Sequence, residues 1–450
     1  MHRYDERTEK IAQLCFDYAI ARLRMFPVPL DGPLSAPELE RLAGGTITPE
    51  GRPPEEVMEL FAEVLAPACI SNDSPKFLAF IPGAPTKASQ LFDVVVSASA
   101  VYGGSWMEGS GAVFAENQAL RWVADLAGLP EGAGGCFVSG GSAGNLSALV
   151  AARESAARRR GDRPARWRVA VGDQAHSSLE STIRIMDALP LVVPTGDDDR
   201  LDGADLRAAL DADPDPSSVF AVVGTGGTTN TGQIDDLEGI AAVARERDLW
   251  FHVDGAYGLA ALAAPSVRDR FRGVEQADSL VVDPHKWLFA PFDCAALLYR
   301  DPELARLAHT QHAAYLDAIE SRDEWNPSDY AYHLTRRARG LPFWFSLAVH
   351  GTHAYTTAIE RTLEIARGAA RRIDAAPHVE LVRHPELGVV LWRRPGWTAA
   401  DYRAWSHRLL AEERAFLMPT TWRGETVARA VFLNPECPPE VMDNIIASMQ

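Results

Sequence analysis

The amino-acid sequence predicts an α/β protein with a mostly parallel sheet in a large domain, followed by a smaller α+β domain at the C-terminus. Three observations support this prediction. Helical runs alternate with short β-rich runs between about residues 55 and 300. The β-rich runs are apolar on both faces, which is typical of parallel strands covered by helices on both sides. Beyond residue 330, a long helical segment leads into further short strands.

The composition is that of a globular protein with an excess of acidic groups. Of the 450 residues, 47% are apolar and 23% are charged, and 44 basic against 61 acidic residues leave a formal charge of −17. Nucleic acids and anionic membranes attract clustered positive charge, so neither is an expected partner. The expected partner is a small molecule.

Cysteine usage and the N-terminus favour the cytoplasm. The five cysteines form no CxxC pair, and we interpret them as buried reduced thiols. The N-terminus lacks a signal-type apolar core, and no apolar stretch approaches the roughly 18 residues of a membrane span. Two HxxH pairs have no carboxylate or cysteine partner, so we expect no metal site.

The first predicted unit is an N-terminal helical arm, residues 1–55. Residues 1–25 place apolar side chains at helical spacing, and Pro27, Pro29 and Pro33 end the helix. An amphipathic helix must bury its apolar face, so we expect this arm to pack on a second subunit.

The predicted sheet belongs to the second unit, residues 56–315. Its strands are expected at 135–139, 168–172, 219–224, 249–255 and 279–284, with a helix from Ala143 after the first strand. The third unit, residues 316–450, begins with an exposed polar loop. It continues with a helix over 341–373 and strands at 379–383, 388–392 and 427–433.

Candidate site residues follow the predicted strands, where ligands of parallel α/β sheets bind. The segment SGGSAGN, residues 139–145, comes after the first strand and opens a helix. Backbone N–H groups of Gly140, Gly141 and Ser142 could cradle a phosphate there. The alternative, a glycine-rich turn that caps a core helix, fits the local pattern equally well.

Asp254 ends the apolar run of FHVDGAYG. A carboxylate at the end of a buried strand is costly unless it meets a cation or a hydrogen-bond donor, and a protonated ring nitrogen would serve. Ala256 is small enough to let a flat ring lie against it. The alternative is an aspartate that caps neighbouring backbone.

Lys286 follows another apolar run, SLVVDPHKW. The 44 basic residues include only four lysines, Lys10, Lys76, Lys87 and Lys286, which leaves 44 − 4 = 40 arginines. A lysine retained in such a chain suggests chemistry that arginine cannot perform, such as imine formation by a desolvated amine. The alternative is a lysine that extends to the surface.

Two further segments could contact a flat cofactor. His176 in DQAHSS follows the second predicted strand, where an imidazole could stack on a ring. The segment TGGTTNTG, residues 225–232, contains Thr229 and could instead form only a tight turn.

Taken together, these segments resemble the pyridoxal-phosphate-dependent group II amino-acid decarboxylases, which include aromatic-L-amino-acid, glutamate and diaminobutyrate decarboxylases. The resemblance rests on five motifs in the family's chain order: SGGSAGNLSAL, DQAHSS, GTTNTG, HVDGAYG and DPHKW. It implies the fold type I of PLP-dependent transferases, pyridoxal 5'-phosphate (PLP) as cofactor, and a homodimer with shared active sites.

By this resemblance, Lys286 holds the cofactor covalently and Asp254 pairs with its pyridine nitrogen. His176 and Ala256 match the residues on the two ring faces. Gly140, Gly141 and Ser142 match the phosphate cradle, Thr229 matches a further cofactor contact, and His285 lies beside the cofactor.

One position departs from the family pattern. Several members have Asn two residues before the His-Lys pair, where it contacts phosphate, and this chain has Asp283. An ionised carboxylate would repel a phosphate, so we expect Asp283 either to point away or to be bridged by another donor.

The reaction and the substrate also follow from the resemblance. Tyr315 matches a tyrosine on a mobile loop that protonates the carbanion, where related aldehyde synthases often have Phe. The stretches lining the substrate pocket in the resembling enzymes contain Phe80, Pro82, Gly83 and Trp106, and their aromatic character favours an aromatic amino acid. Lys87 nearby leaves room for an acidic one. The leading hypothesis is decarboxylation. The alternatives are an aldehyde synthase or another PLP reaction, and a catalytically silent PLP-binding protein.

Overall fold

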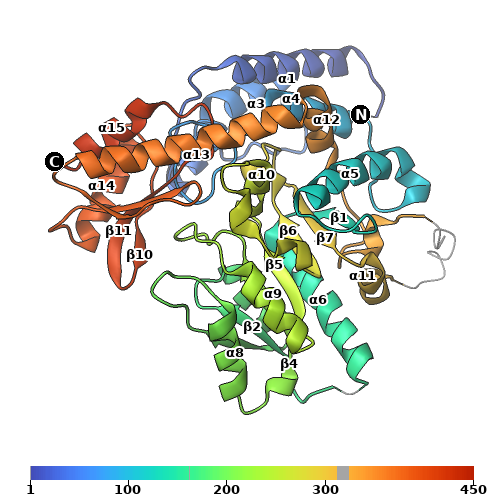
Figure 1. Ribbon diagram of the computed structural model, residues 1–450. Helices are drawn as coiled ribbons and strands as arrows, with labels where there is room; N and C mark the ends of the chain where they lie inside the picture. Colours follow the sequence, from blue (N-terminus) through green and yellow to red (C-terminus); the bar gives the residue numbers. More distant parts are fainter. Residues whose placement is uncertain (1, 162, 312–323) are drawn as a thin grey trace.

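The computed structural model describes residues 2–161, 163–311 and 324–450. Its centre is a seven-stranded sheet in the order β1-β7-β6-β5-β4-β2-β3 (Figure 1). Strand β7 is antiparallel to both β1 and β6, and the other neighbouring pairs are parallel. The strands are β1 (Gly134–Val138), β2 (Arg168–Gly172), β3 (Leu189–Val193), β4 (Val219–Thr225), β5 (Trp250–Asp254), β6 (Ser279–Val282) and β7 (Ala295–Tyr299). The predicted mostly parallel sheet is confirmed.

Five strands lie where the sequence predicts them, and β3 and β7 were not predicted. Strand β3 is an edge strand that contains Pro190. An edge tolerates proline because one side of the strand needs no ladder hydrogen bond, but the proline weakens the sequence signal. Strand β7 is fully buried between β1 and β6.

Helices cover both faces of this sheet. One buried cluster combines β-strand residues with α6 and α7, and another combines them with α5, α8 and α9. The helices are α4 (Lys87–Ala98), α5 (Trp106–Leu126), α6 (Gly141–Arg160), α7 (Ser177–Ile185), α8 (Gly203–Ala212), α9 (Leu237–Glu246), α10 (Pro284–Trp287) and α11 (Pro302–His309). Short 3-10 turns complete the connections, at Pro216–Ser218, Gly258–Ala263, Arg268–Phe271, Val274–Gln276 and Pro327–Asp329.

The C-terminal region has its own sheet and core. Four antiparallel strands are ordered β10-β11-β9-β8, and Trp392 and Trp405 lie in a separate buried cluster. The elements are β8 (Glu380–Arg383), β9 (Val389–Arg393), α14 (Ala399–Ala411), β10 (Thr420–Trp422), β11 (Glu425–Val431) and α15 (Pro439–Ala447).

The prediction of a single helix over residues 341–373 is wrong. The segment forms two helices, α12 (Leu341–His350) and α13 (Thr352–Ala375). Gly351 separates them with φ of +74°, a backbone conformation that glycine adopts without a Cβ clash.

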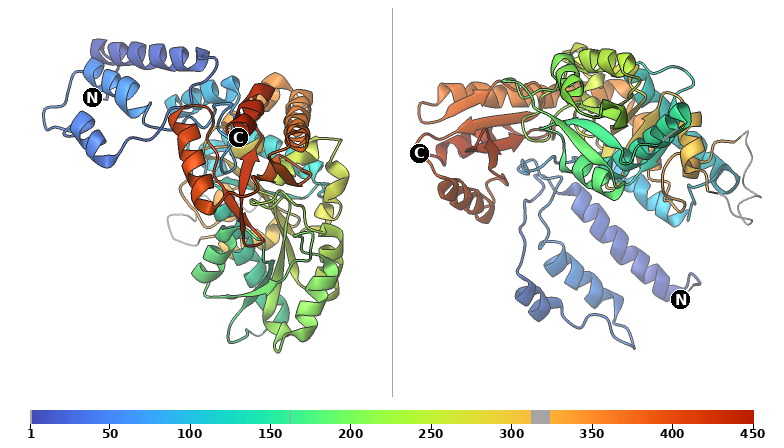
Figure 2. Two further views of the ribbon diagram at one scale, coloured as in Figure 1. Left: turned by 90° about the vertical axis from the view of Figure 1, so that its left-hand side faces the viewer. Right: turned by 90° about the horizontal axis from the view of Figure 1, so that it is seen from below.

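The N-terminal helices stand away from the rest of the chain (Figure 2). None of α1 (Glu6–Arg24), α2 (Ala36–Ala43), α3 (Pro54–Leu60) or the π-helical turn Phe61–Leu65 has a buried residue. Phe16 is 55% exposed and Phe26 is 80% exposed. Among the described residues, no helix is both long enough and apolar enough to span a bilayer.

Candidate active site

The predicted cofactor-binding residues meet in one cavity. The carboxyl ends of β1, β2, β4, β5 and β6 lie at the same edge of the sheet, and a cavity of about 350 Å³ opens there. Its lining includes every residue predicted to bind the cofactor: Gly140, Gly141, Ser142, His176, Thr229, Asp254, Ala256, His285 and Lys286. Tyr315 lies outside the described residues.

Asp254 is a buried residue of this cavity. It is the last residue of β5 and is 5% exposed. One oxygen accepts a hydrogen bond from Asn145 Nδ2 at 2.9 Å, and the other accepts one from the Ala256 N–H at 3.2 Å. Both oxygens therefore have a donor within the protein, which stabilises a carboxylate in a buried position.

A chain of hydrogen bonds runs from Asp254 back into the sheet. Asn145 Oδ1 lies 2.9 Å from His252 Nε2, and His252 Nδ1 lies 2.8 Å from Ser279 Oγ. Trp250 Nε1 donates to the same Ser279 oxygen at 2.8 Å.

The chemistry of the partners determines which group donates and which accepts in each of these hydrogen bonds. Because the Asp254 oxygens only accept, Asn145 turns its NH2 group toward them and its carbonyl toward His252. His252 Nε2 therefore donates, and its Nδ1 accepts from the Ser279 hydroxyl. Complete burial lowers the pKa of His252 to about 4, so the ring is neutral at pH 7. Every hydrogen bond in this series therefore donates in the direction of Asp254.

His176 is connected to the same asparagine. Its Nδ1 accepts a hydrogen bond from the Ser178 N–H at 3.2 Å and lies 2.8 Å from Ser178 Oγ. Asn145 Nδ2 also donates to Ser178 Oγ, at 3.2 Å. The asparagine thus links the carboxylate to the imidazole, and the His176 ring remains exposed at the cavity edge.

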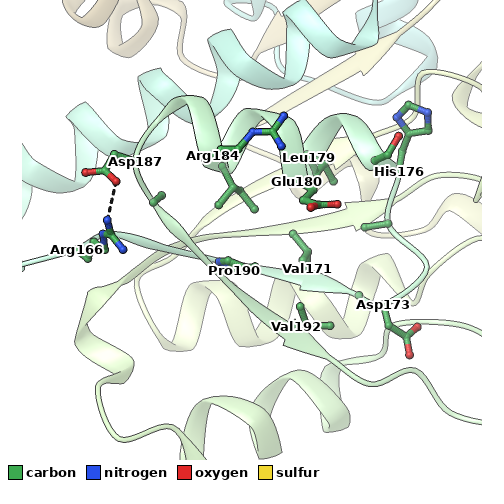
Figure 3. Close-up of a pocket in the computed structure, with 15 residues that line it drawn as sticks. Arg166, Val171, Asp173, His176, Leu179, Glu180, Arg184, Asp187, Pro190 and Val192 are labelled. Carbon is green, nitrogen blue, oxygen red and sulfur yellow. Dashed lines mark hydrogen bonds and ion pairs between the residues drawn. The ribbon is translucent and has the colours of Figure 1, made fainter.

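His176 also borders a second, more apolar groove of about 570 Å³ between α7 and β3 (Figure 3). Leu179, Val171 and Val192 lie along this groove, and Arg166 pairs with Asp187 at its far end. The imidazole therefore separates the strand-end cavity from the groove.

The helix N-terminus and the lysine also line the cavity. A Cβ atom on Gly141 would lie 2.9 Å from Ala256 Cβ, so this close approach requires glycine. Lys286 Nζ lies 2.8 Å from Asp283 Oδ2, and the Gly141 N–H donates to the same oxygen at 3.2 Å. Asp283 does not point away from the cradle. Its Oδ2 accepts from both of these donors.

His285 is held by backbone beside these groups. Its Nδ1 accepts from the Cys294 N–H at 3.0 Å, and its Nε2 lies 3.6 Å from Asp283 Oδ2. Burial lowers the pKa of His285, against the opposing effect of the Asp283 carboxylate. Its ring lies 5.0 Å from that of Phe292, centroid to centroid.

These residues suit a flat, phosphate-bearing aldehyde. The cavity offers an amine, a carboxylate with its donors already in place, a small methyl face at Ala256, an exposed imidazole and a helix N-terminus. The family model described as the pyridoxal-dependent decarboxylase conserved domain matches residues 38–394.

The chain belongs to this family.

Individual relatives agree with the family assignment. Aromatic-L-amino-acid decarboxylase of Bacillus atrophaeus is 29% identical over 418 residues, which cover 90% of this chain and 86% of that protein. The 3,4-dihydroxyphenylacetaldehyde synthase of Aedes aegypti is 28% identical over 87% of this chain and 78% of its own length.

Among solved structures, that of Oryza sativa TDC with PLP and tryptamine matches with a TM-score of 0.88 and 26% identity, over 98% of this chain and 96% of that chain. The predictions of fold type I, of PLP as cofactor and of an amino-acid decarboxylase are confirmed. When bound, this cofactor supplies a conjugated ring that accepts the electron pair released as CO2 leaves.

Several residues of this decarboxylase site were missed by the sequence analysis. Asn145 and His252 lie within the recognised motifs, but nothing in their local pattern assigns them a role. Arg429 of β11 donates to the carbonyl of Thr229 at 2.6 Å and to that of Asn230 at 3.3 Å. Burial lowers the pKa of this guanidinium to about 10. It attaches the Thr229 loop to the C-terminal sheet.

The predicted substrate-pocket residues do not line this cavity. Phe80 is 56% exposed and its ring packs near Phe416, and Lys87 Nζ lies 3.7 Å from Asp73 Oδ2 in a different pocket. The Trp106 N–H donates to Asn326 Oδ1 at 2.9 Å, at the start of α5. Their part in substrate binding stays a prediction.

Gly83 lies against the segment that carries Lys286. Pro82 is buried, and a Cβ on Gly83 would meet the carbonyl oxygen of His285 at 2.3 Å. Any side chain at position 83 would therefore displace the backbone that carries Lys286.

Proposed function

We propose that this chain decarboxylates an aromatic L-amino acid to the corresponding amine and CO2. The observation that carries this proposal is the meeting of Lys286, Asp254 and His176 in one strand-end cavity. The relative from Bacillus atrophaeus, named for aromatic amino acids, and the rice structure with tryptamine support the substrate class.

Each side chain then has a defined task. Lys286 attaches the cofactor through its amine and later accepts or releases a proton at Nζ. Asp254 holds a proton on the pyridine nitrogen, because its two internal donors maintain the carboxylate. His176 would contact one ring face of the bound cofactor and Ala256 the other. The N–H groups of Gly140, Gly141 and Ser142 bind the phosphate, and Thr229 and His285 complete the cofactor contacts.

Protonation of the product carbon is the step that separates the two candidate reactions. We assign it to Tyr315, assisted by His285, as the family resemblance implies. The second candidate function, aldehyde synthesis, is favoured by one observation, the similarity to the Aedes aegypti synthase. Because related synthases often have Phe where this chain has Tyr315, decarboxylation remains the proposal.

The arm supports a homodimer. Helix α1 exposes Ile11, Phe16 and Ile20, and a second copy would cover them. We propose that residues 1–55 pack on the partner and that the two subunits share active sites. Phe16→Ser with Ile20→Ser should therefore shift the protein toward monomer in analytical ultracentrifugation. The cytoplasmic location stays a prediction from the sequence.

Lysine replacement tests the proposal directly. Wild-type enzyme incubated with aromatic amino acids should release amine and CO2 in equal amounts, and Lys286→Ala and Lys286→Arg should both lose the visible absorption of the bound cofactor. The arginine variant keeps the positive charge, so its failure would isolate the need for a nucleophilic amine. Peroxide and aldehyde in place of amine would favour the second candidate, and a colourless wild type would contradict both.

Tyr315→Phe separates the two reactions further. The variant should keep the cofactor's absorption but lose amine release, because the proton donor is absent. Amine release at the wild-type rate would remove Tyr315 from the mechanism.

A further inference from the structure

The cavity contains a second buried carboxylate, Asp283, besides Asp254. Asp283 is 1% exposed. Its Oδ2 accepts from the Gly141 N–H at 3.2 Å and pairs with Lys286 Nζ at 2.8 Å. Its Oδ1 is buried and has no hydrogen-bond partner in the part of the chain that the structure describes.

This carboxylate occupies a donor that the phosphate needs. The Gly141 N–H is part of the proposed cradle, and a backbone N–H directed at one anion is not available to another. A bound phosphate monoester carries roughly −1.5 to −2 charges at pH 7 and, like a carboxylate, mainly accepts hydrogen bonds. The two anions therefore compete for one helix N-terminus.

The surroundings offer little positive charge to offset the repulsion between the Asp283 carboxylate and a phosphate. Of the described residues that line the cavity, only Lys286 carries a full positive charge, against the carboxylates of Asp254, Asp283 and Asp293. His285, His176 and Tyr257 complete the titratable lining among the described residues; burial lowers the pKa of His285 and raises that of Tyr257. Once the Lys286 amine is joined to the cofactor, it is a weaker partner for Asp283.

We propose that Asp283 lowers the enzyme's affinity for the phosphate group of its cofactor, by occupying the cradle when the cofactor is absent and opposing the phosphate when it is present. Asp283 is thus a determinant of cofactor exchange. The inference rests on the assignment of Gly140, Gly141 and Ser142 as the phosphate cradle. It predicts a weaker preference for PLP over phosphate-free pyridoxal than an uncharged residue would give.

Asp283→Asn is the variant that tests this. Asn keeps an oxygen that can accept from the Gly141 N–H, removes the charge, and adds a donor for the phosphate. Dissociation constants of PLP and of pyridoxal are measured by absorbance titration of cofactor-free enzyme, without substrate. The ratio of the two constants cancels effects on the lysine, which both aldehydes share. The preference for PLP, which is the dissociation constant of pyridoxal divided by that of PLP, should be at least about tenfold greater in Asp283→Asn than in wild type.

Asp293→Asn is the matched control. Asp293 lines the same cavity but is 47% exposed and pairs with Arg339 at 2.6 Å, away from Gly141. Removing its charge should change the ratio by less than about threefold. An equal shift in both variants would assign the effect to the overall charge of the cavity and overturn the specific role of Asp283. An unchanged or reduced preference for PLP in Asp283→Asn would also overturn it.

A second measurement covers the case in which pyridoxal binds too weakly to titrate. The inhibition constant of inorganic phosphate against PLP binding, corrected for the PLP affinity of each protein, should be at least about tenfold lower for cofactor-free Asp283→Asn than for wild type. Equal inhibition constants would contradict the proposal. Thermal unfolding of both variants shows whether they fold. Because no substrate is present, this result does not depend on which amino acid the enzyme decarboxylates.

Discussion

The two buried carboxylates of the cofactor cavity, Asp254 and Asp283, differ in the hydrogen-bond partners of their oxygens. Asp254 has a donor on each oxygen and a chain of hydrogen bonds behind it that reaches Trp250. Asp283 shares one oxygen between Lys286 and Gly141, and its other oxygen has no partner among the described residues. Asp254 has its partners without a ligand, and Asp283 has contacts that a ligand must rearrange.

This difference matches the two demands that a cofactor makes. In the proposed assignment, the pyridine end at Asp254 must hold a charge in a fixed place throughout the reaction, which requires dipoles that are already oriented. The proposed phosphate end at Gly141 provides only anchoring, so its contacts can be exchanged when the cofactor enters or leaves. The following predictions test this contrast.

The largest expected effect is at the pyridine end. Asp254→Asn should keep the cofactor attached to Lys286 but reduce turnover on the order of 10²- to 10³-fold, the loss typical of removing one preorganised electrostatic contact. Steady-state amine release with excess PLP measures this loss, and the visible spectrum confirms attachment. Turnover within tenfold of wild type would contradict the role of Asp254.

Variants at two residues of helix α6 compare how much the proposed pyridine and phosphate ends contribute to the free energy of unfolding. Asn145→Ala should lower the free energy of unfolding of the cofactor-free protein by about 2 to 4 kcal/mol, because it leaves one oxygen of Asp254 and the Nε2 of His252 without their partner in a buried site. Ser142→Ala should change it by less than about 0.5 kcal/mol, because Ser142 is exposed. Urea denaturation of both variants checks the contrast, and equal losses would show that the ends do not differ.

The last effect depends on pH. The pKa of His252 is lowered to about 4 in the folded protein from 6.5, so the unfolded chain binds more protons between these values. Stability from His252 is therefore present above pH 6.5 and is lost as the pH falls toward 4, by roughly 3 kcal/mol in total. His252→Gln, which can still donate to Asn145, should lack this loss.

The difference between wild type and His252→Gln, measured by urea denaturation from pH 7 to 4.5, isolates the effect. Asp235, whose pKa burial raises to about 7, acts in the opposite direction, since its neutral form is favoured in the folded state. Both proteins contain Asp235, so its contribution cancels. Parallel pH profiles would show that the hydrogen-bond chain does not depend on a neutral His252.

Much of the architecture could be predicted because its causes are local. Strands β1, β2, β4, β5 and β6 are apolar on both faces, and polar or glycine residues follow each of them. These patterns identified Lys286, Asp254 and His176 as neighbours, because parallel strands bring their carboxyl ends to one edge. Strand β3, with its proline, and the break at Gly351 gave weaker signals because single residues decide them.

The sequence by itself determined the family, the cofactor and the residues at the strand ends, since each depends on a short motif in a fixed order. Only the tertiary structure decided which of those residues have hydrogen-bond partners for their buried polar atoms. Asn145 and His252 are 107 positions apart, and Asp283 meets Gly141 across 142 positions. Hydrogen bonds between distant segments depend on how the sheet and helix α6 pack, and no local pattern encodes that geometry.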